Sequence, residues 1–98
     1  MSTTVTTLQV TDELDLATMP RLVSTVDQAL QAQPRTLRLD LSTCPFAGVD
    51  ALDGLASLTT LARSQGTTLV LVGVRPIVSR AIDLLGLDDT LQTSEPAA

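Results

Sequence analysis

The chain alternates between segments with strand-like and helix-like spacing of apolar residues. Residues 4–10, TVTTLQV, are rich in β-branched side chains and end at a polar turn, which predicts a strand. Residues 36–41 alternate leucines with Arg38 and Asp40, as expected for a strand with one better-buried face. The continuous apolar run LVLV at 69–72 is typical of a central parallel strand that is covered on both faces.

Helical periodicity marks three further segments, at residues 20–32, 48–64 and 76–85. Thr18 is the candidate N-cap of the first, and Pro20 lies in its first turn. Gly66 and Gly86 follow the second and third segments and are typical of helix ends. In the third segment we expect the inward face to be formed by Ile77, Ala81, Leu84 and Leu85.

Strands that alternate with helices predict an α/β fold with a small, mostly parallel sheet of about four strands, right-handed crossovers and helices packed on the sheet. A short last strand is expected around residues 90–93. The 98 residues have room for a single domain, which we place at residues 1–93. A flexible C-terminal tail is expected at 94–98.

Composition restricts the chemistry that is open to the chain. It contains no histidine and no lysine, which removes the commonest general base, the commonest metal ligand, and Schiff-base or Walker-type chemistry. The glycine motifs of nucleotide-binding loops are absent from the sequence. We therefore expect no enzymatic activity, no metal and no cofactor.

Charge and cysteine content indicate the kind of partner and the compartment. A net charge of −5 argues against nucleic acid as a partner. The single cysteine, Cys44, cannot form an internal disulfide, and we interpret it as a buried filler, with an acidified redox thiol as the alternative. With no leader and no apolar run of membrane-spanning length, we expect a cytoplasmic location without direct membrane insertion.

The loop at residues 42–50 lies between a predicted strand and a predicted helix, where sites are common in parallel sheets. Asp50 is interpreted as a cap of that helix, or as part of an acidic recognition patch with Asp53 one turn later. For Asp53 a solvated helix face is the alternative. Ser42 and Thr43 are candidate phosphoacceptors, with turn formation as the alternative.

Three blocks of the sequence resemble the signature blocks of the STAS family, which is named after sulfate transporters and anti-sigma factor antagonists. They are DELDLATMPRL at 12–22, LRLDLSTCPFAGVDALDGLASL at 37–58 and LVLVGVRPIVSRAIDLLGLDDTL at 69–91. The resemblance covers roughly residues 5–93. Asp12 stands where family members usually have glycine, whereas the following Glu-Leu-Asp, the Asp-Leu-Ser at 40–42 and Phe46 match the pattern.

The resemblance also identifies a missing switch. In the phosphorylated antagonists of this family the second helix begins with Asp-Ser-Ser/Thr-Gly, and the serine after the aspartate accepts phosphate from a kinase that is also the anti-sigma factor. The corresponding residues here are Gly48, Val49, Asp50 and Ala51, so the phosphoacceptor-equivalent position is Val49, which is not phosphorylatable. Asp50 brings one charge where a phosphate brings about −1.5 to −2, so it is at best a partial mimic.

The resemblance implies a non-enzymatic, protein-binding regulatory domain, most like an anti-sigma factor antagonist, whose partner is a kinase-like anti-sigma factor. Asp50 would either permit that partner to bind permanently or block it. The expected partner-binding residues are Asp15, Thr18, Ser42, Val49, Asp50 and Asp53. The neighbouring acidic residues Asp12 and Glu13 are interpreted as an exposed turn that helps to cap the first helix.

Other interpretations stay open. Some short family members are accessory subunits that bind the ATPase of an ABC transporter moving lipids, and a transporter ATPase is therefore an alternative partner. A second alternative is a small-anion or nucleotide sensor that uses the free amides of the helix at 48–64, although Asp50 would compete for them. The chain is short relative to the family pattern at both ends, so exposed surface there makes homodimerisation a further candidate.

Overall fold

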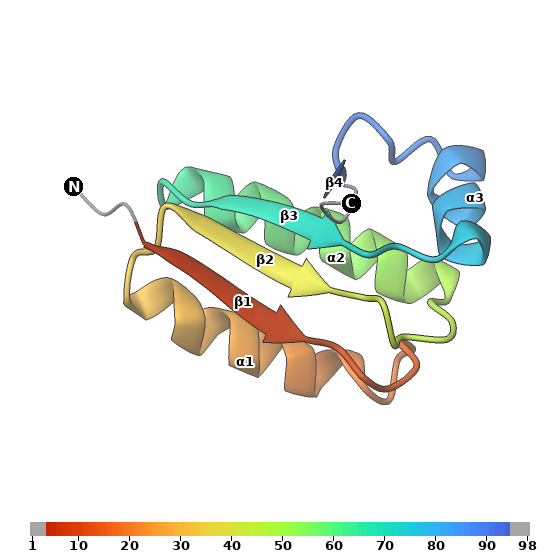
Figure 1. Cartoon of the computed structure of the whole chain (residues 1–98), viewed down its shortest axis with the longest axis horizontal. Helices are drawn as coiled ribbons and strands as arrows, with labels where there is room; N and C mark the ends of the chain where they lie inside the picture. The colour runs from red at the N-terminus through yellow and green to blue at the C-terminus, as the bar shows by residue number, and fades with distance from the viewer. Residues whose placement is uncertain (1–3, 95–98) are drawn as a thin grey trace.

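The computed structural model describes residues 4–94, which form four strands and three helices in alternation (Figure 1). The strands are β1 (Val5–Gln9), β2 (Thr36–Asp40), β3 (Thr68–Val72) and β4 (Gln92–Ser94). The helices are α1 (Met19–Gln31), α2 (Val49–Ser64) and α3 (Pro76–Leu84). The predicted elements are present in order, with ends that differ by no more than two residues. Of the predicted tail at 94–98, all but Ser94 lies outside the described residues.

All four strands are parallel and follow the order β1-β2-β3-β4. In the middle of the sheet, Leu39 of β2 lies between Leu8 of β1 and Leu71 of β3. Leu39 and Leu71 are fully buried, and burial of each such leucine stabilises the fold by about 1.5–3 kcal/mol. The predicted α/β fold with a small parallel sheet of about four strands is confirmed.

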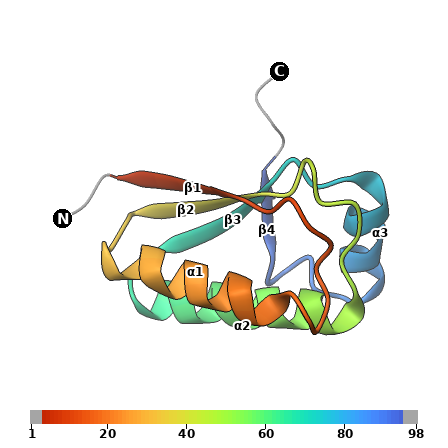
Figure 2. The same ribbon diagram turned by 90° about the horizontal axis from the view of Figure 1, so that it is seen from below.

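The helices lie on one side of the sheet because every connection joins neighbouring strands through a crossover of the same hand. Figure 2 shows α1 and α2 side by side beneath the strands and α3 beyond the ends of the central strands. One face of α2 is buried, at Leu52, Leu55, Leu58, Thr59 and Ala62. Gly54 of α2 provides the space in which the Met19 side chain of α1 packs.

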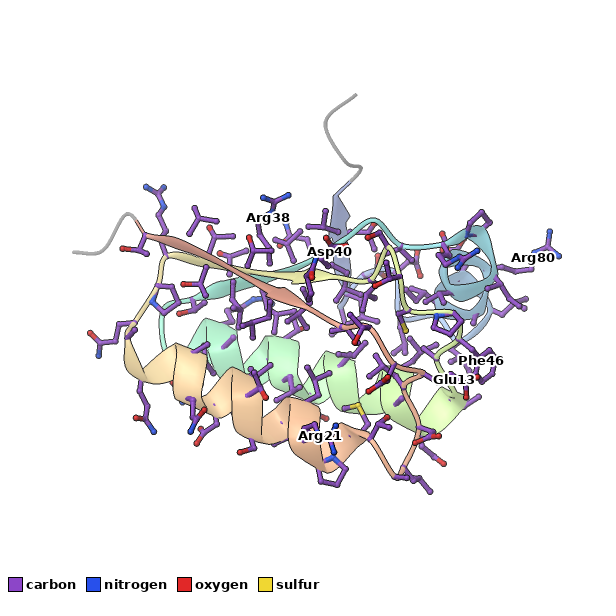
Figure 3. All side chains as sticks on the ribbon, turned by 60° about the horizontal axis from the view of Figure 1, so that its bottom comes forward. Glu13, Arg21, Arg38, Asp40, Phe46 and Arg80 are labelled. Carbon is purple, nitrogen blue, oxygen red and sulfur yellow. The ribbon has the colours of Figure 1, made fainter. Side chains whose placement is uncertain are left out.

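No helix covers the other face of the sheet within residues 4–94 (Figure 2), although Val72 at the end of β3 is buried on this face. One row across it consists of Thr7, Arg38, Val70 and Gln92, of which only Val70 is partly buried. Figure 3 shows Arg38 projecting from this face, away from α1 and α2. The prediction that β3 is covered on both faces is correct only in part, because helices pack against one face (Figure 2), while on the other face Val72 is buried, Val70 is partly buried and Thr68 is exposed.

The phase predicted for α3 is also wrong. Its buried residues are Val78 and Ile82, whereas Ile77, Leu84 and Leu85 are exposed, at 58%, 80% and 38% of their surface. The nine-residue helix carries apolar side chains around most of its circumference, so periodicity alone cannot distinguish the inner face from the outer one. Because the buried face is narrow, apolar side chains remain exposed on the surface of α3.

The connection after β3 depends on Gly73. Its φ angle is +67°, a conformation that favours glycine, and a Cβ atom there would lie 2.9 Å from the Cβ of Ser42 and 3.3 Å from an oxygen of Asp40. The ends of β2 and β3 can approach this closely because Gly73 has no side chain. Gly66, after α2, has a similar φ of +85° but open space around it.

We expect Gly73→Ala to destabilise the domain more than Gly66→Ala. The left-handed conformation costs either alanine about 1–2 kcal/mol. At Gly73 the methyl group also meets Ser42, which adds an overpacking cost of about 1–3 kcal/mol. Urea unfolding of both variants measures the difference, and equal losses would show that the contact with Ser42 relaxes without cost.

Candidate functional site

Two loops meet at the carboxyl end of the sheet, one after β1 and one after β2. The backbone N–H of Leu14 donates to the carbonyl of Phe46, and the N–H of Gly48 donates to the carbonyl of Leu14, each at 2.9 Å. Leu14 and Ala47 form a parallel bridge between the loops, and both side chains are buried. The loops therefore hold a fixed position relative to each other and to the start of α2.

The turn before α1 is closed by the side chain of Asp15. One carboxylate oxygen accepts hydrogen bonds from the backbone N–H groups of Ala17 and Thr18, both at 2.9 Å. Thr18 occupies the predicted N-cap position, but its side chain makes no cap hydrogen bond, so that part of the prediction is wrong. Its hydroxyl instead donates to the carbonyl of Glu13 at 2.7 Å and accepts from the N–H of Asp15 at 3.0 Å.

This turn projects Leu16 outward, and 71% of its surface is exposed. Leu16 lies between Asp15 and Ala17, which are bonded to each other across it, so its backbone is fixed while its side chain makes little contact with the core. A single exposed leucine is common on protein surfaces, so Leu16 becomes a candidate contact residue only together with the exposed apolar side chains beside it.

The first turn of α2 lies directly beside the turn that carries Leu16. Gly48 is the N-cap in an extended conformation, and no side chain makes a cap hydrogen bond there, so the predicted capping bond from Asp50 is wrong. Asp50 is the second residue of the helix and is exposed, which leaves its charge to interact with the helix dipole only. Val49, the first helical residue, is 57% exposed.

Leu16 and Val49 line the same shallow depression, with a volume of about 410 Å³. Its other lining residues are Asp15, Ala17, Gly48, Asp50 and Ala51. Phe46, the only aromatic residue, lies beside it, with a ring carbon 3.9 Å from the position of a Cβ on Gly48 and 47% of its surface exposed. Figure 3 shows Phe46 at this end of the molecule, near Glu13.

The structure thus brings together three of the predicted site residues, Asp15, Val49 and Asp50, with Thr18 bonded to Asp15 behind them. Leu16 and Phe46 are not among the residues that the sequence predicts for the site. One signal was available for Leu16, because an apolar residue in an acidic turn, Asp15-Leu16-Ala17-Thr18, has no periodic reason to be there.

Ser42 and Asp53 lie apart from the depression. The N–H of Ser42 donates to a carboxylate oxygen of Asp40 at 2.9 Å, and its Cβ faces Gly73 at the end of β3. Hydrogen bonds from the Ser42 side chain and backbone lower the pKa of Asp40, with a smaller contribution from the charge of Arg38. Ser42 thus closes a turn, and Asp53 lies on the exposed side of α2 one turn after Asp50.

Cys44 is fully buried beneath the same loop. Its Sγ lies 3.4 Å from the carbonyl oxygen of Phe46, and burial raises the pKa of the thiol. A buried thiol that stays protonated is a poor nucleophile and a poor redox centre. The structure therefore agrees with the interpretation of Cys44 as a filler and contradicts the alternative of an acidified thiol.

The described residues give little support for metal chemistry or for crossing a bilayer. Between Thr4 and Ser94, histidine, cysteine and carboxylate side chains nowhere gather in a group of three that could hold a metal ion. Among the helices in the same range, none is long and apolar enough to span a membrane. The site therefore consists of apolar side chains, carboxylates and backbone amides.

We expect Asp15→Ala to lower the free energy of unfolding by about 0.5–2 kcal/mol, because two backbone N–H groups lose their acceptor. Asp15→Asn keeps an acceptor oxygen and should cost less. Asp12→Ala, an exposed residue of the same loop, is the matched control and should change stability little. Thermal or urea unfolding measures the free energy of unfolding of each variant. Equal values for Asp15→Ala and Asp12→Ala would contradict this role of the Asp15 side chain.

Comparison with solved structures shows that the fold is a known one. A crystal structure from Thermotoga maritima, described as a "putative anti-sigma factor antagonist", is similar with a TM-score of 0.82 at 20% sequence identity, over 95% of this chain and 80% of that one. An NMR structure of the same bacterial protein is similar with a TM-score of 0.79 at 21% identity, over 93% of this chain and 74% of that one. At this level of identity the likeness concerns the fold.

Comparison with curated proteins gives no match. The family model of the STAS domain matches residues 2–97, which is nearly the whole chain. Together with the parallel sheet, the one-sided helices and the loops at its carboxyl end, this match confirms the family that the three sequence blocks indicate. The chain belongs to the STAS domain family.

Proposed function

We propose that this STAS domain is a non-enzymatic regulatory module that binds a protein partner through the surface around the start of α2. We call this surface the α2 entrance, and define it by Leu16, Phe46, Val49 and Asp50, with Asp53 at its edge. The observation that carries the proposal is the exposure of the three apolar side chains on a rigid pair of loops. Leu16, Val49 and Phe46 are 71%, 57% and 47% exposed.

Exposed apolar side chains that lie together favour a protein as the ligand. Contiguous exposed apolar patches mark interaction surfaces, and aromatic residues such as Phe46 are enriched in protein interfaces. A depression of about 410 Å³ between Leu16 and Val49 offers room for a side chain of the partner. Its open form and few polar groups fit a small-anion or nucleotide ligand less well, since such ligands are usually bound in enclosed pockets.

Rigidity of the α2 entrance supports the same conclusion. Its loops are joined by the two hydrogen bonds of Leu14, and the turn that carries Leu16 is closed by Asp15 and Thr18. A surface that is ordered before binding loses little conformational entropy when the partner arrives. We propose that Asp15 and Thr18 contribute to binding chiefly by holding Leu16 in place.

Carboxylates give the α2 entrance its charge. Asp50 is exposed beside Val49, and Asp53 follows one turn later on the exposed side of α2. Such charges at the rim of an interface raise the association rate with a basic partner surface and select against acidic ones. Ser42 lies apart, so we propose for it a part at the periphery of the interface at most.

The class of partner that we propose is a kinase-like anti-sigma factor, as the family resemblance implies. Val49 stands at the position that carries the phosphorylated serine in switched family members, and its side chain has no hydroxyl to phosphorylate. Binding at the α2 entrance would then be insensitive to a kinase acting at this position. The absence of histidine and lysine from the sequence and the buried, protonated Cys44 support a non-enzymatic role.

The proposal predicts that the partner depends on Asp50. The tagged domain and its Asp50→Arg variant are used to retrieve proteins from the native host's lysate, followed by mass spectrometry. Asp27→Arg, an equally exposed aspartate on α1, is the matched control for the change in charge. We expect one partner to be lost with Asp50→Arg and kept with Asp27→Arg, and the same partner to be lost with Leu16→Ser.

Retention of all partners by Asp50→Arg and Leu16→Ser would remove the α2 entrance from the interface. Recovery of a kinase-like anti-sigma factor would support the proposed class. Recovery of the ATPase of a transporter that depends on the same residues would keep the binding surface and replace the class of partner.

The partner class also predicts that Val49→Ser introduces a phosphorylation site. The side chain at this position is accessible, because Val49 is 57% exposed at the first residue of α2. With the recovered kinase-like partner and ATP, we expect mass spectrometry to find phosphate on Val49→Ser and not on Val49→Ala or the native chain. Phosphate on the native chain, at Ser42 or elsewhere, would show that another hydroxyl has taken over the switch.

A further inference from the structure

The outer edge of β1 is open to pairing within the described residues. β1 is the first strand in the sheet order and pairs only with β2 (Figure 1). The N–H of Val10 donates to the carbonyl of Asp40. Because the backbone groups of successive residues in a strand point to opposite sides, every second residue before Val10 also directs its N–H and C=O toward β2. The backbone N–H and C=O groups of Val5, Thr7 and Gln9 therefore point away from the sheet.

This edge lacks the features by which proteins usually prevent strand pairing. Its five residues, VTTLQ, include no charge, no proline and no glycine, and the strand contains no residue that interrupts its register with β2. Edge strands of this kind are the ones that pair with another chain. The opposite edge differs, because β4 has three residues only.

A groove runs beside the same edge, between β1 and α1. It has a volume of about 200 Å³, and Leu8 of β1 and Leu22 and Thr25 of α1 are among the residues that line it. Leu8 is only partly buried, although its neighbours Leu39 and Leu71 in the same row of the sheet are fully buried. The apolar core thus reaches the surface at this point, where a further layer would complete it.

We propose that β1 pairs with β1 of a second copy in antiparallel orientation, centred on Thr7. In this register Thr7 lies opposite Thr7 of the second copy and Val5 lies opposite Gln9. The outward-facing backbone groups of these three residues can then satisfy each other. The result is a continuous sheet of twice the width, in which each Leu8 packs beside Thr6 of the other copy.

The helix layer is compatible with this pairing. The side of α1 toward the β1 edge carries Thr18 and Thr25, and helical spacing places Ala29 and Ala32 in the same row. Small side chains allow two helices to approach to the usual interaxial distance of about 8–10 Å. The two α1 helices would therefore meet through the small side chains near Thr25, whereas Arg21, which also lines the groove, lies about one helical turn away.

Charge does not oppose a second copy at this edge. The chain carries a net charge of −5, so most pairs of surfaces on two copies repel each other. Along the β1 edge the charged side chains that line the groove are Asp12 and Arg21, which have opposite signs and lie beyond the centre of the paired segment. The middle of the proposed interface, at Thr7 and Thr25, contains no charge.

The pairing is independent of the function proposed for the α2 entrance. A twofold axis through Thr7 reverses the direction of the second sheet, so the carboxyl ends of the two sheets point in opposite directions. Each α2 entrance then lies at its own end of the dimer and stays accessible to a partner. The dimer would present two binding surfaces to two partners.

Sedimentation velocity over a series of protein concentrations tests the inference. We expect a reversible dimer, and we expect Thr7→Lys to raise its dissociation constant by about tenfold or more, because the two ammonium groups would lie opposite each other. Thr68→Lys places the same charge on β3, on the same face but away from the edge, and should leave dimerisation unchanged. Hydrogen exchange should show amides of Thr7 and Gln9 that become protected as the concentration rises.

A second pair of variants keeps the test valid if changes in β1 disturb folding. Thr25→Lys alters the helix side of the proposed interface, and Ser24→Lys, its exposed neighbour on the other side of α1, is the matched control. A chain that stays monomeric at every concentration would overturn the inference. So would a dimer that Thr7→Lys and Thr25→Lys leave intact, or one in which the amide of Thr7 stays unprotected.

Discussion

The site depends on the two hydrogen bonds made by the backbone of Leu14, one to the carbonyl of Phe46 and one from the N–H of Gly48. They join the loop after β1 to the loop after β2 just beyond the point where regular strand pairing ends, at Gln9 and Asp40. Because Leu14 and Ala47 are also buried, the loops cannot separate without exposing core surface. Leu16 and Val49 are brought together by these backbone contacts, which do not depend on the identity of the two side chains.

The sequential order of the strands explains the rest of the architecture. With each strand added beside the previous one, right-handed crossovers place the three helices of residues 4–94 on one side, and within this range the other face and both edges of the sheet carry no helix (Figure 2). The uncovered face is rich in threonine and carries Arg38, side chains that tolerate water on a strand. One consequence of this topology is that β1, an uncharged edge strand, has backbone groups with no partner in residues 4–94. The sequential strand order therefore leaves β1 as an edge strand that is open to pairing.

Most of the fold was predictable from the sequence, because its elements have clear periods and clear ends. The buried residues of α2 lie on one face of the helix, and the alternating leucines of β2 lie on one face of the sheet. Gly66 and Gly86, which adopt positive φ angles, mark the ends of α2 and α3. Periodicity failed where apolar residues were more numerous than the buried positions. In α3 the sequence offers Ile77, Val78, Ile82, Leu84 and Leu85, and only the tertiary contacts select Val78 and Ile82 as the buried ones. The run at 69–72 is apolar throughout, but helices cover one face of β3 only (Figure 2), and on the other face Val70 stays partly exposed.

The site was predictable in position but not in the roles of its residues. The end of a parallel strand and the start of a helix indicated the region, and Val49 and Asp50 do lie at the depression. The carboxylates looked alike in the sequence, yet Asp15 binds the backbone of its own turn, Asp40 binds Ser42, and Asp50 makes no cap bond. These differences depend on loop geometry over distances of a few ångströms, which no spacing rule encodes. One oxygen of Asp15 is occupied by the backbone of its own turn, whereas Asp50 is exposed without a cap bond, which is why the proposed binding surface is defined by Asp50 and the apolar residues beside it.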